Sequence, residues 1–266
     1  MIGIIEFIQD PANLFTWQVI SLLILAGFLV GFINTIAGSG TVITYSLFMT
    51  MGMPANIANG TIRLGVILQT LSATFNFKRH GVLDWKKGLI LSIPIALGSI
   101  IGAQIAAMLE VKLFEKVLAL IMLSMIFFLF QNPKKWVEGH AEKMAQRSTK
   151  KDLLIFFCIG LYGGFTHIGV GIFLLAALVL RAGYDLVRAN AIKVLSVLVY
   201  SPFALFVFVI NNQVDYKIGL ISAIGNIFGG ILASRLAVNW GAGFIRWFLV
   251  AIIILFNAKV FGLFNM

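Results

Sequence analysis

Two glycine-rich stretches, each set within apolar sequence, carry the polar side chains best suited to binding chemistry. The first reads Gly31-Phe32-Ile33-Asn34-Thr35-Ile36-Ala37-Gly38-Ser39-Gly40-Thr41. Its Gly-Ser-Gly segment cannot sustain a stable helix, because glycine loses the most backbone entropy on ordering. A helix that begins near Thr41 would point its N–H groups at this break, and such an arrangement binds anions. Taken alone, the stretch could equally serve close helix packing.

A second break follows in a repeat of the first. It lies in Tyr162-Gly163-Gly164-Phe165-Thr166-His167-Ile168-Gly169-Val170-Gly171. At a spacing of 133, Gly31-Phe32 matches Gly164-Phe165, and Gly38 matches Gly171. After a two-residue slip, a spacing of 131 matches Gly52 with Gly183, Asn59 with Asn190, and Asp84-Trp85 with Asp215-Tyr216. Interrupted helices at corresponding positions of two halves favour a transporter binding site over simple packing.

Two cations occupy related positions in the halves. Arg63 follows Asn59 by four residues, so the two side chains share a helix face and suit an oxyanion. The alternative for Arg63 is a guanidinium that reaches for lipid headgroups. In the second half Lys193 follows Asn190 by three residues. The pair of cations predicts an anionic substrate.

His167 falls on the second break, opposite Asn34 at the spacing of 133. It could bond the substrate or exchange a proton, although a lone histidine is often structural. The sequence shows no His/Cys cluster for a metal, no phosphate-binding loop and no nucleophile elbow, so neither an enzyme nor a cofactor is expected. The expected substrate-binding residues are Asn34, Thr35, Gly38, Ser39, Gly40, Thr41, Asn59, Arg63, His167, Gly169, Gly171, Asn190 and Lys193.

The composition identifies the elements that must position these residues as membrane helices. The chain has 266 residues, of which 60% are hydrophobic and only 11% charged. Crossing the hydrocarbon takes about 20 apolar residues. Full-length spans are expected at 17–37, 60–77, 88–108, 113–131, 152–168, 190–210, 217–236 and 243–263. Two shorter apolar pieces, at 40–52 and 170–182, are half-helices, re-entrant pieces or short crossings. The predicted fold is an all-α polytopic membrane protein.

The cations predict how the chain is divided and oriented. Lysines and arginines cluster at 78–87 and again at 134–151, and both loops should be cytoplasmic. The counterpart of the first loop, at 211–217, has only Lys217, which favours inverted halves with the N-terminus outside. We expect a first repeat at 1–131, a basic linker at 132–151 and a second repeat at 152–266. The net charge of +10 therefore reflects topology and not nucleic-acid binding.

Taken together, these segments resemble the sulfite exporter TauE/SafE family over nearly the whole chain. The resemblance rests on 27–40, on Asn59-Gly60-Thr61-Ile62-Arg63-Leu64, on 72–77 with 81–85, on 162–165 and on 188–193. Ser39 and His167 depart from the pattern expected of the family. The resemblance implies a secondary transporter that moves small sulfur-containing anions, such as sulfite or organosulfonates, across the cytoplasmic membrane.

Two alternatives to an exporter stay open at this point. One is an anion channel, since a paired break can also line a pore. The other is a non-transporting assembly subunit whose glycines only pack helices. The expected partners are a small anion and the lipid bilayer; a coupling proton or sodium ion and a homo-oligomer are open questions. The substrate and the direction of transport are also open.

Overall fold

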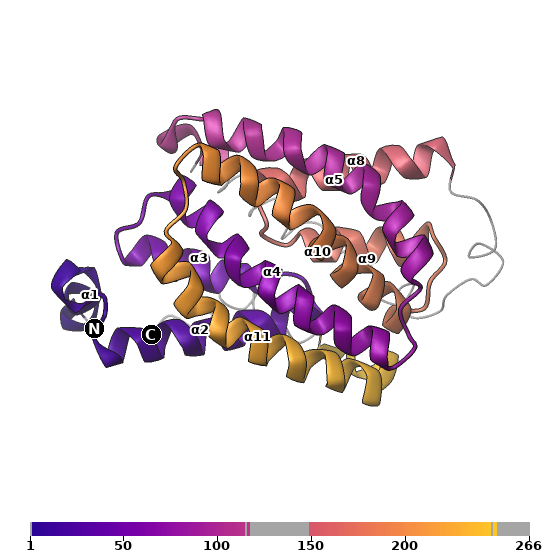
Figure 1. Ribbon diagram of the computed structural model, residues 1–266, viewed down its shortest axis with the longest axis horizontal. Helices are drawn as coiled ribbons and strands as arrows, with labels where there is room; N and C mark the ends of the chain where they lie inside the picture. The colour runs from indigo at the N-terminus through magenta and orange to yellow at the C-terminus, as the bar shows by residue number, and fades with distance from the viewer. Residues whose placement is uncertain (1, 115, 118–148, 246, 249–266) are drawn as a thin grey trace.

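The computed structural model describes residues 2–114, 116–117, 149–245 and 247–248, and the regular elements in these ranges are all helices (Figure 1). The expected spans at 113–131 and 243–263, and most of the 132–151 linker, lie largely outside them. The helices are α1 (Ile2–Gln9), η1 (Pro11–Asn13), α2 (Trp17–Ile36), α3 (Thr41–Thr50), α4 (Ala55–Arg79), α5 (Trp85–Met108), α8 (Lys150–Phe165), α9 (Val170–Leu180), α10 (Leu186–Ile210) and α11 (Tyr216–Asn239).

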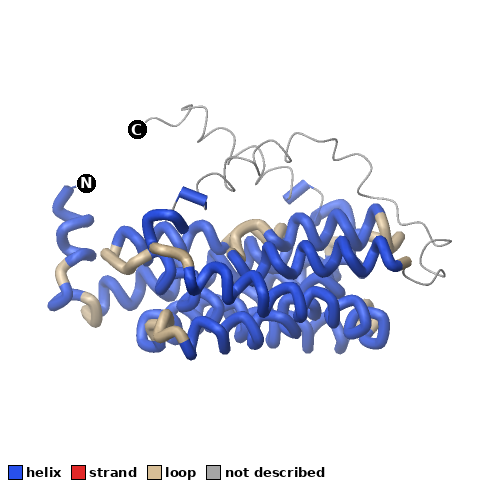
Figure 2. Tube along the Cα trace, turned by 90° about the horizontal axis from the view of Figure 1, so that it is seen from above, coloured by secondary structure: helices blue, strands red, loops and turns tan. Residues whose placement is uncertain are grey.

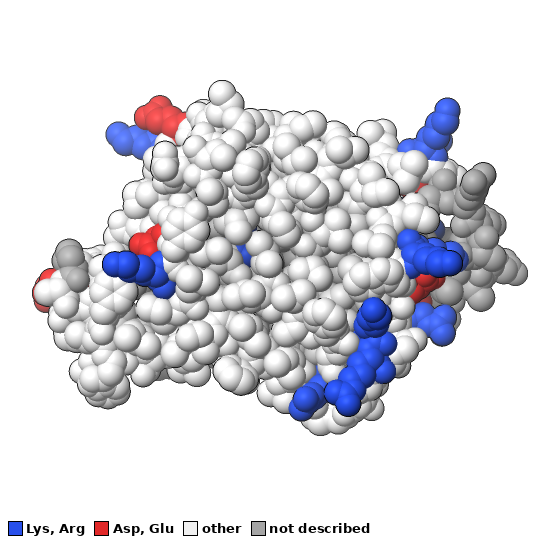
Figure 3. Space-filling model, viewed as in Figure 1, with Lys and Arg blue, Asp and Glu red and all other residues white. Residues whose placement is uncertain are grey.

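Length and composition suit several of these helices to a bilayer. By these criteria α2, α5, α10 and α11 can each cross a membrane, while α3 and α9 are shorter apolar helices. The outer faces stay apolar: Ile93, Leu97 and Phe206 are more than half exposed. The face drawn in Figure 3 is largely uncharged along its middle, with charged side chains toward its two ends. Such a surface fits lipid rather than water.

The first glycine break turns α2 and α3 into a hairpin. Val19 near the start of α2 and Phe48 near the end of α3 belong to one buried cluster, together with Ala55 at the start of α4. The Tyr45 hydroxyl donates to the Ala55 carbonyl at 2.9 Å. The chain therefore turns back at the break, and the 40–52 piece forms the short arm of a hairpin.

The second break forms a matching hairpin from α8 and α9. At its base Arg181 Nη2 lies 2.9 Å from Asp152 Oδ1. Thr149 and Asp152 also form a capping box at the first turn of α8. Because the end of α9 is tied to the start of α8, the 170–182 piece forms the short arm of this second hairpin.

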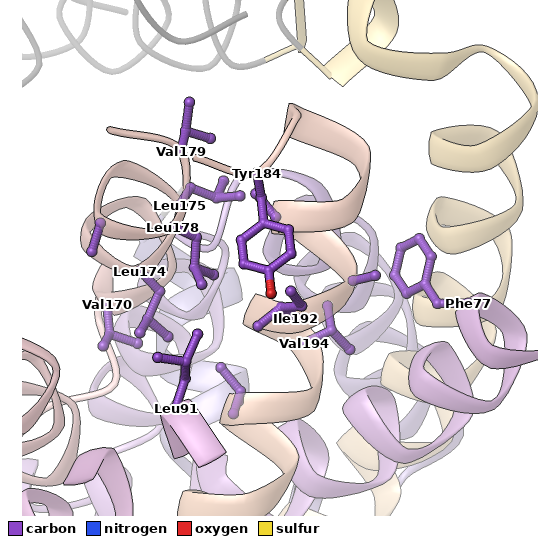
Figure 4. Close-up of a cluster of buried hydrophobic side chains, with 14 of the residues drawn as sticks. Phe77, Leu91, Val170, Leu174, Leu175, Leu178, Val179, Tyr184, Ile192 and Val194 are labelled. Atoms are coloured by element: carbon purple, nitrogen blue, oxygen red, sulfur yellow. The ribbon is translucent and has the colours of Figure 1, made fainter. Parts of the chain in front are cut away.

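The two hairpins enter from opposite ends of α4. Ala55, where α4 begins, lies in the cluster with the base of the first hairpin. Phe77, near its last turn, lies in the cluster that contains Phe156 and Val179 from the second hairpin. In Figure 4, Val170, Leu174 and Leu178 of α9 follow one another along this core. Their spacing of four residues gives α9 one face to bury.

Helices from the two halves cross-pack. α2 packs mainly on α11 and α8 mainly on α5, while α4 and α10 lie between these pairs and contact each other. Seen from above, the described helices form a bundle whose hairpin arms run alongside the longer helices (Figure 2). Neither hairpin is therefore held by its own half alone.

Left-handed backbone positions recur at one spacing. Gly38 and Gly169 have φ of 78° and 71°, Gly52 and Gly183 have 85° and 78°, and Gly81 and Asn212 have 70° and 55°. Each pair is 131 residues apart. The spacing therefore changes from 133 to 131 before Gly38. In backbone conformation Gly38 corresponds to Gly169, whereas the sequence comparison had matched it with Gly171.

Candidate functional site

The tips of the two hairpins touch at Gly38 and Gly171. The Gly171 N–H donates to the Gly38 carbonyl at 3.3 Å. A Cβ placed on either glycine would lie 2.3 Å from the Cα of the other. Since real Cβ atoms do not approach so closely, only glycine permits this contact. The two predicted breaks meet in space.

A small pocket lies where the tips meet. It is lined by Asn34, Gly38, Gln69, Thr70, His167, Val170, Gly171, Lys193, Val194 and Val197. Five of these residues are predicted site residues, contributed by both breaks and by α10. The pocket is narrow in this conformation.

A polar chain links the two breaks through His167. Its Nδ1 lies 2.8 Å from the Tyr200 hydroxyl, and its Nε2 lies 3.5 Å from Asn34 Nδ2. Its backbone carbonyl accepts a hydrogen bond from the Thr41 hydroxyl at 3.4 Å. His167 is therefore held on both ring nitrogens and contacts the first break.

Gln69 adds a polar group that the sequence reading missed. Its Nε2 donates to the Thr35 hydroxyl at 3.1 Å, while its Oε1 is buried without a partner. Gln69 and Tyr200 are 131 residues apart, and each bonds the break of its own half. The repeat, searched for polar side chains within apolar helices, could have identified both.

Arg63 caps the helix that ends at the second break. Its guanidinium donates to the carbonyls of Gly163 at 3.2 Å and Gly164 at 2.6 Å, in the last turn of α8. Its Cζ also lies 4.8 Å from the centroid of the Phe208 ring. The side chain is fully buried, so it does not reach toward headgroups from here. A cation is favourable at a helix C-terminus.

Lys193 caps the helix that ends at the first break. Its ammonium donates to three carbonyls in the last turn of α2, those of Asn34, Thr35 and Ile36, at 3.2, 2.7 and 3.4 Å. Arg63 of the first half thus holds α8 of the second, and Lys193 of the second half holds α2 of the first. Lys193 also lines the pocket, whereas Arg63 does not.

The remaining predicted residues flank the pocket without lining it. Asn59 donates to the Phe165 carbonyl at 2.8 Å and so joins the cap on α8. Asn190 is fully buried, and neither polar atom of its side chain has a partner within the described part of the chain. Ser39 Oγ is likewise buried and unpartnered. Gly40 and Gly169 are the N-cap residues of α3 and α9.

A family model for the sulfite exporter TauE/SafE matches residues 23–260. The chain belongs to this family. Within the TauE/SafE family, the match covers both breaks and both buried cations. No solved structure matches the chain.

Similar proteins of the TauE/SafE type carry transporter names. A "probable membrane transporter protein" of Haemophilus influenzae is 29% identical, with 91% of this chain and 94% of that protein aligned. ORF9 of a Sinorhizobium species and YfcA of Escherichia coli, named in the same way, are 27% and 26% identical over about nine tenths of each chain. The chain is a membrane protein of the transporter type, and these names indicate no catalytic activity.

Proposed function

We propose that this protein is a secondary transporter that exports small sulfur-containing anions, such as sulfite or organosulfonates, across the cytoplasmic membrane. The observation that carries the proposal is the meeting of two hairpin tips at a pocket with polar side chains from both halves. Discontinuous helices that meet inside a bundle are typical of transporter binding sites. The substrate class comes from the family description.

The chemistry of the pocket suits an anion. An anion that leaves water must regain donors, because a bare charge in a low dielectric is very costly. Asn34, Gln69 and Lys193 carry amide or ammonium donors at the pocket wall, and the α3 and α9 N-termini lie beside it. Substrate oxygens would draw some of these donors away from their present partners, and the bonds to the anion must outweigh the cost of about 1–3 kcal/mol for each buried acceptor left unsatisfied.

The arrangement of the hairpins supports an inverted repeat within a multi-pass protein of the cytoplasmic membrane. The hairpin bases lie at opposite ends of α4. The lysines and arginines at 78–87 lie at the same end as Lys150 and Lys151, and we place this end in the cytoplasm. The expected repeats at 1–131 and 152–266 would then be related by a two-fold axis in the membrane plane that passes near the tips.

Counterflow in proteoliposomes tests the proposal and separates it from its alternatives. Vesicles loaded with unlabelled sulfite should transiently concentrate external labelled sulfite, because a carrier exchanges substrate across one site. A channel would show net sulfite flux without this overshoot. An assembly subunit would show no flux above that of protein-free vesicles. Either result would remove the proposed carrier function.

A further inference from the structure

Two basic side chains are buried at the centre of the molecule, and their hydrogen-bond partners in the described part of the chain are neutral. Arg63 and Lys193 are 0% and 1% exposed. Their hydrogen bonds go to backbone carbonyls, and the Arg63 guanidinium also lies over the Phe208 ring. These hydrogen bonds satisfy N–H donors of the two side chains, but a backbone carbonyl does not supply a full negative charge.

The described residues offer no buried carboxylate to balance these cations. Their acids lie at helix ends or in turns, and none is buried: Glu6, Asp10, Asp84, Glu110, Asp152, Asp185 and Asp215. The helix dipoles do not balance them either. Each hairpin brings one C-terminus and one N-terminus to the same tip, and their half-charges of about −0.5 and +0.5 offset each other.

We infer that the site selects doubly charged anions over singly charged ones of the same shape. This inference rests on the proposed transport of anions through the pocket. Two buried charges without counterions are unfavourable, and their attraction for an incoming charge is strong where water is excluded. A dianion brings enough charge to balance both Lys193 at the pocket wall and Arg63 outside the lining, while a monoanion leaves one of the two uncompensated. The site would thus discriminate between substrates by their charge as well as by their size.

Sulfate and methanesulfonate test this charge selectivity, because the two anions are nearly isosteric and differ by one charge. Each is used as a competitor of labelled sulfite flux in proteoliposomes that contain the full-length protein. We expect sulfate to inhibit at a concentration about tenfold or more below that of methanesulfonate. Equal inhibition by both, stronger inhibition by methanesulfonate, or sulfite flux that neither inhibits overturns the charge selectivity. Absence of any sulfite flux instead contradicts the proposed transport.

Variants at Lys193 assign the selectivity to the buried charge. Lys193→Met removes one charge and keeps much of the side-chain volume, so the preference for sulfate should fall by about tenfold. Lys193→Arg keeps the charge and should keep the preference. A Lys193→Met protein that transports sulfite with unchanged preference contradicts the assignment. If Lys193→Met does not fold, the wild-type competition still decides the inference.

Discussion

Arg63 combines two roles at the scale of a single residue, because it supplies charge near the pocket and also caps α8. We expect Arg63→Gln to weaken sulfite binding by roughly 2–5 kcal/mol, the usual cost of truncating one partner of a buried charge contact. Arg63→Lys keeps the charge but cannot bond two carbonyls with one planar fork, so its loss should be smaller. Sulfite titrations of both purified variants measure the difference. Equal affinity in wild type and Arg63→Gln would falsify a role for this charge.

Tyr200 acts on the site through His167, whose ring it orients with a hydrogen bond of 2.8 Å. Tyr200→Phe removes that bond and should weaken sulfite affinity by about 0.5–1.5 kcal/mol, the net value of one buried hydrogen bond. Tyr45→Phe is the matched control, because the Tyr45 hydroxyl bonds a carbonyl at the base of the first hairpin. The control should bind sulfite as wild type does. Similar losses in both variants would show that the Tyr200 effect is only one of stability.

The sequence singled out some of the residues that line the pocket or bond to them, and missed others. Asn34, Gly38, His167, Gly171 and Lys193 could be found because breaks and buried cations leave strong local patterns. Gln69 and Tyr200 escaped, since a single polar group within a long apolar helix reveals its partner only after folding. Arg63 and Lys193 were expected to supply charge to the substrate, with contact to lipid headgroups as the alternative for Arg63. Their bonds to helix ends could not be foreseen, because they depend on how the halves cross-pack.

At the scale of the elements, the contact between Gly38 and Gly171 fixes how closely the hairpins approach. Gly171→Ala places a methyl group 2.3 Å from the Gly38 Cα, so the tips must separate. Overpacking of this kind costs about 1–3 kcal/mol. We expect a lower melting temperature and a large loss of sulfite flux.

Gly243→Ala is the control for that substitution, since an added Cβ there has no neighbour within 4 Å among the described residues. It should leave both the melting temperature and the flux unchanged. If Gly171→Ala behaves like Gly243→Ala, the tips do not touch in the working protein.

The positions of the helices could be predicted from the sequence, whereas the course of the chain at the two breaks could not. The starts and ends of α4, α5, α10 and α11 lie near capping and turn residues such as Asp84, Asp185 and Asp215, which are readable locally. For the 40–52 and 170–182 pieces the sequence left three alternatives open, and the structure shows that each folds back as the short arm of a hairpin. Length alone could not decide among them, because the choice depends on contacts such as Arg181 with Asp152.

At the scale of the whole molecule, the hairpins that enter from opposite ends predict a labelling pattern. Single cysteines in a Cys158→Ala background should react with impermeant reagent from the cytoplasm at 86 and 151, and from outside at 112 and 213. The positive-inside rule sets this orientation. Reaction at 86 from outside would show that the protein has the opposite orientation in the membrane. Reaction at 86 and 213 from the same side would contradict inverted halves.

The central claim is that an anion binds where the two tips meet, and Gln69 offers the most direct test. Gln69→Glu keeps the side-chain shape but turns a carboxylate toward the pocket, whereas Gln213→Glu makes the same change where the amide bonds the Ala107 carbonyl. Titration calorimetry with sulfite should show one site per chain in wild type and in Gln213→Glu, and none in a folded Gln69→Glu protein. Unaltered binding in Gln69→Glu, or none in wild type, would contradict the account.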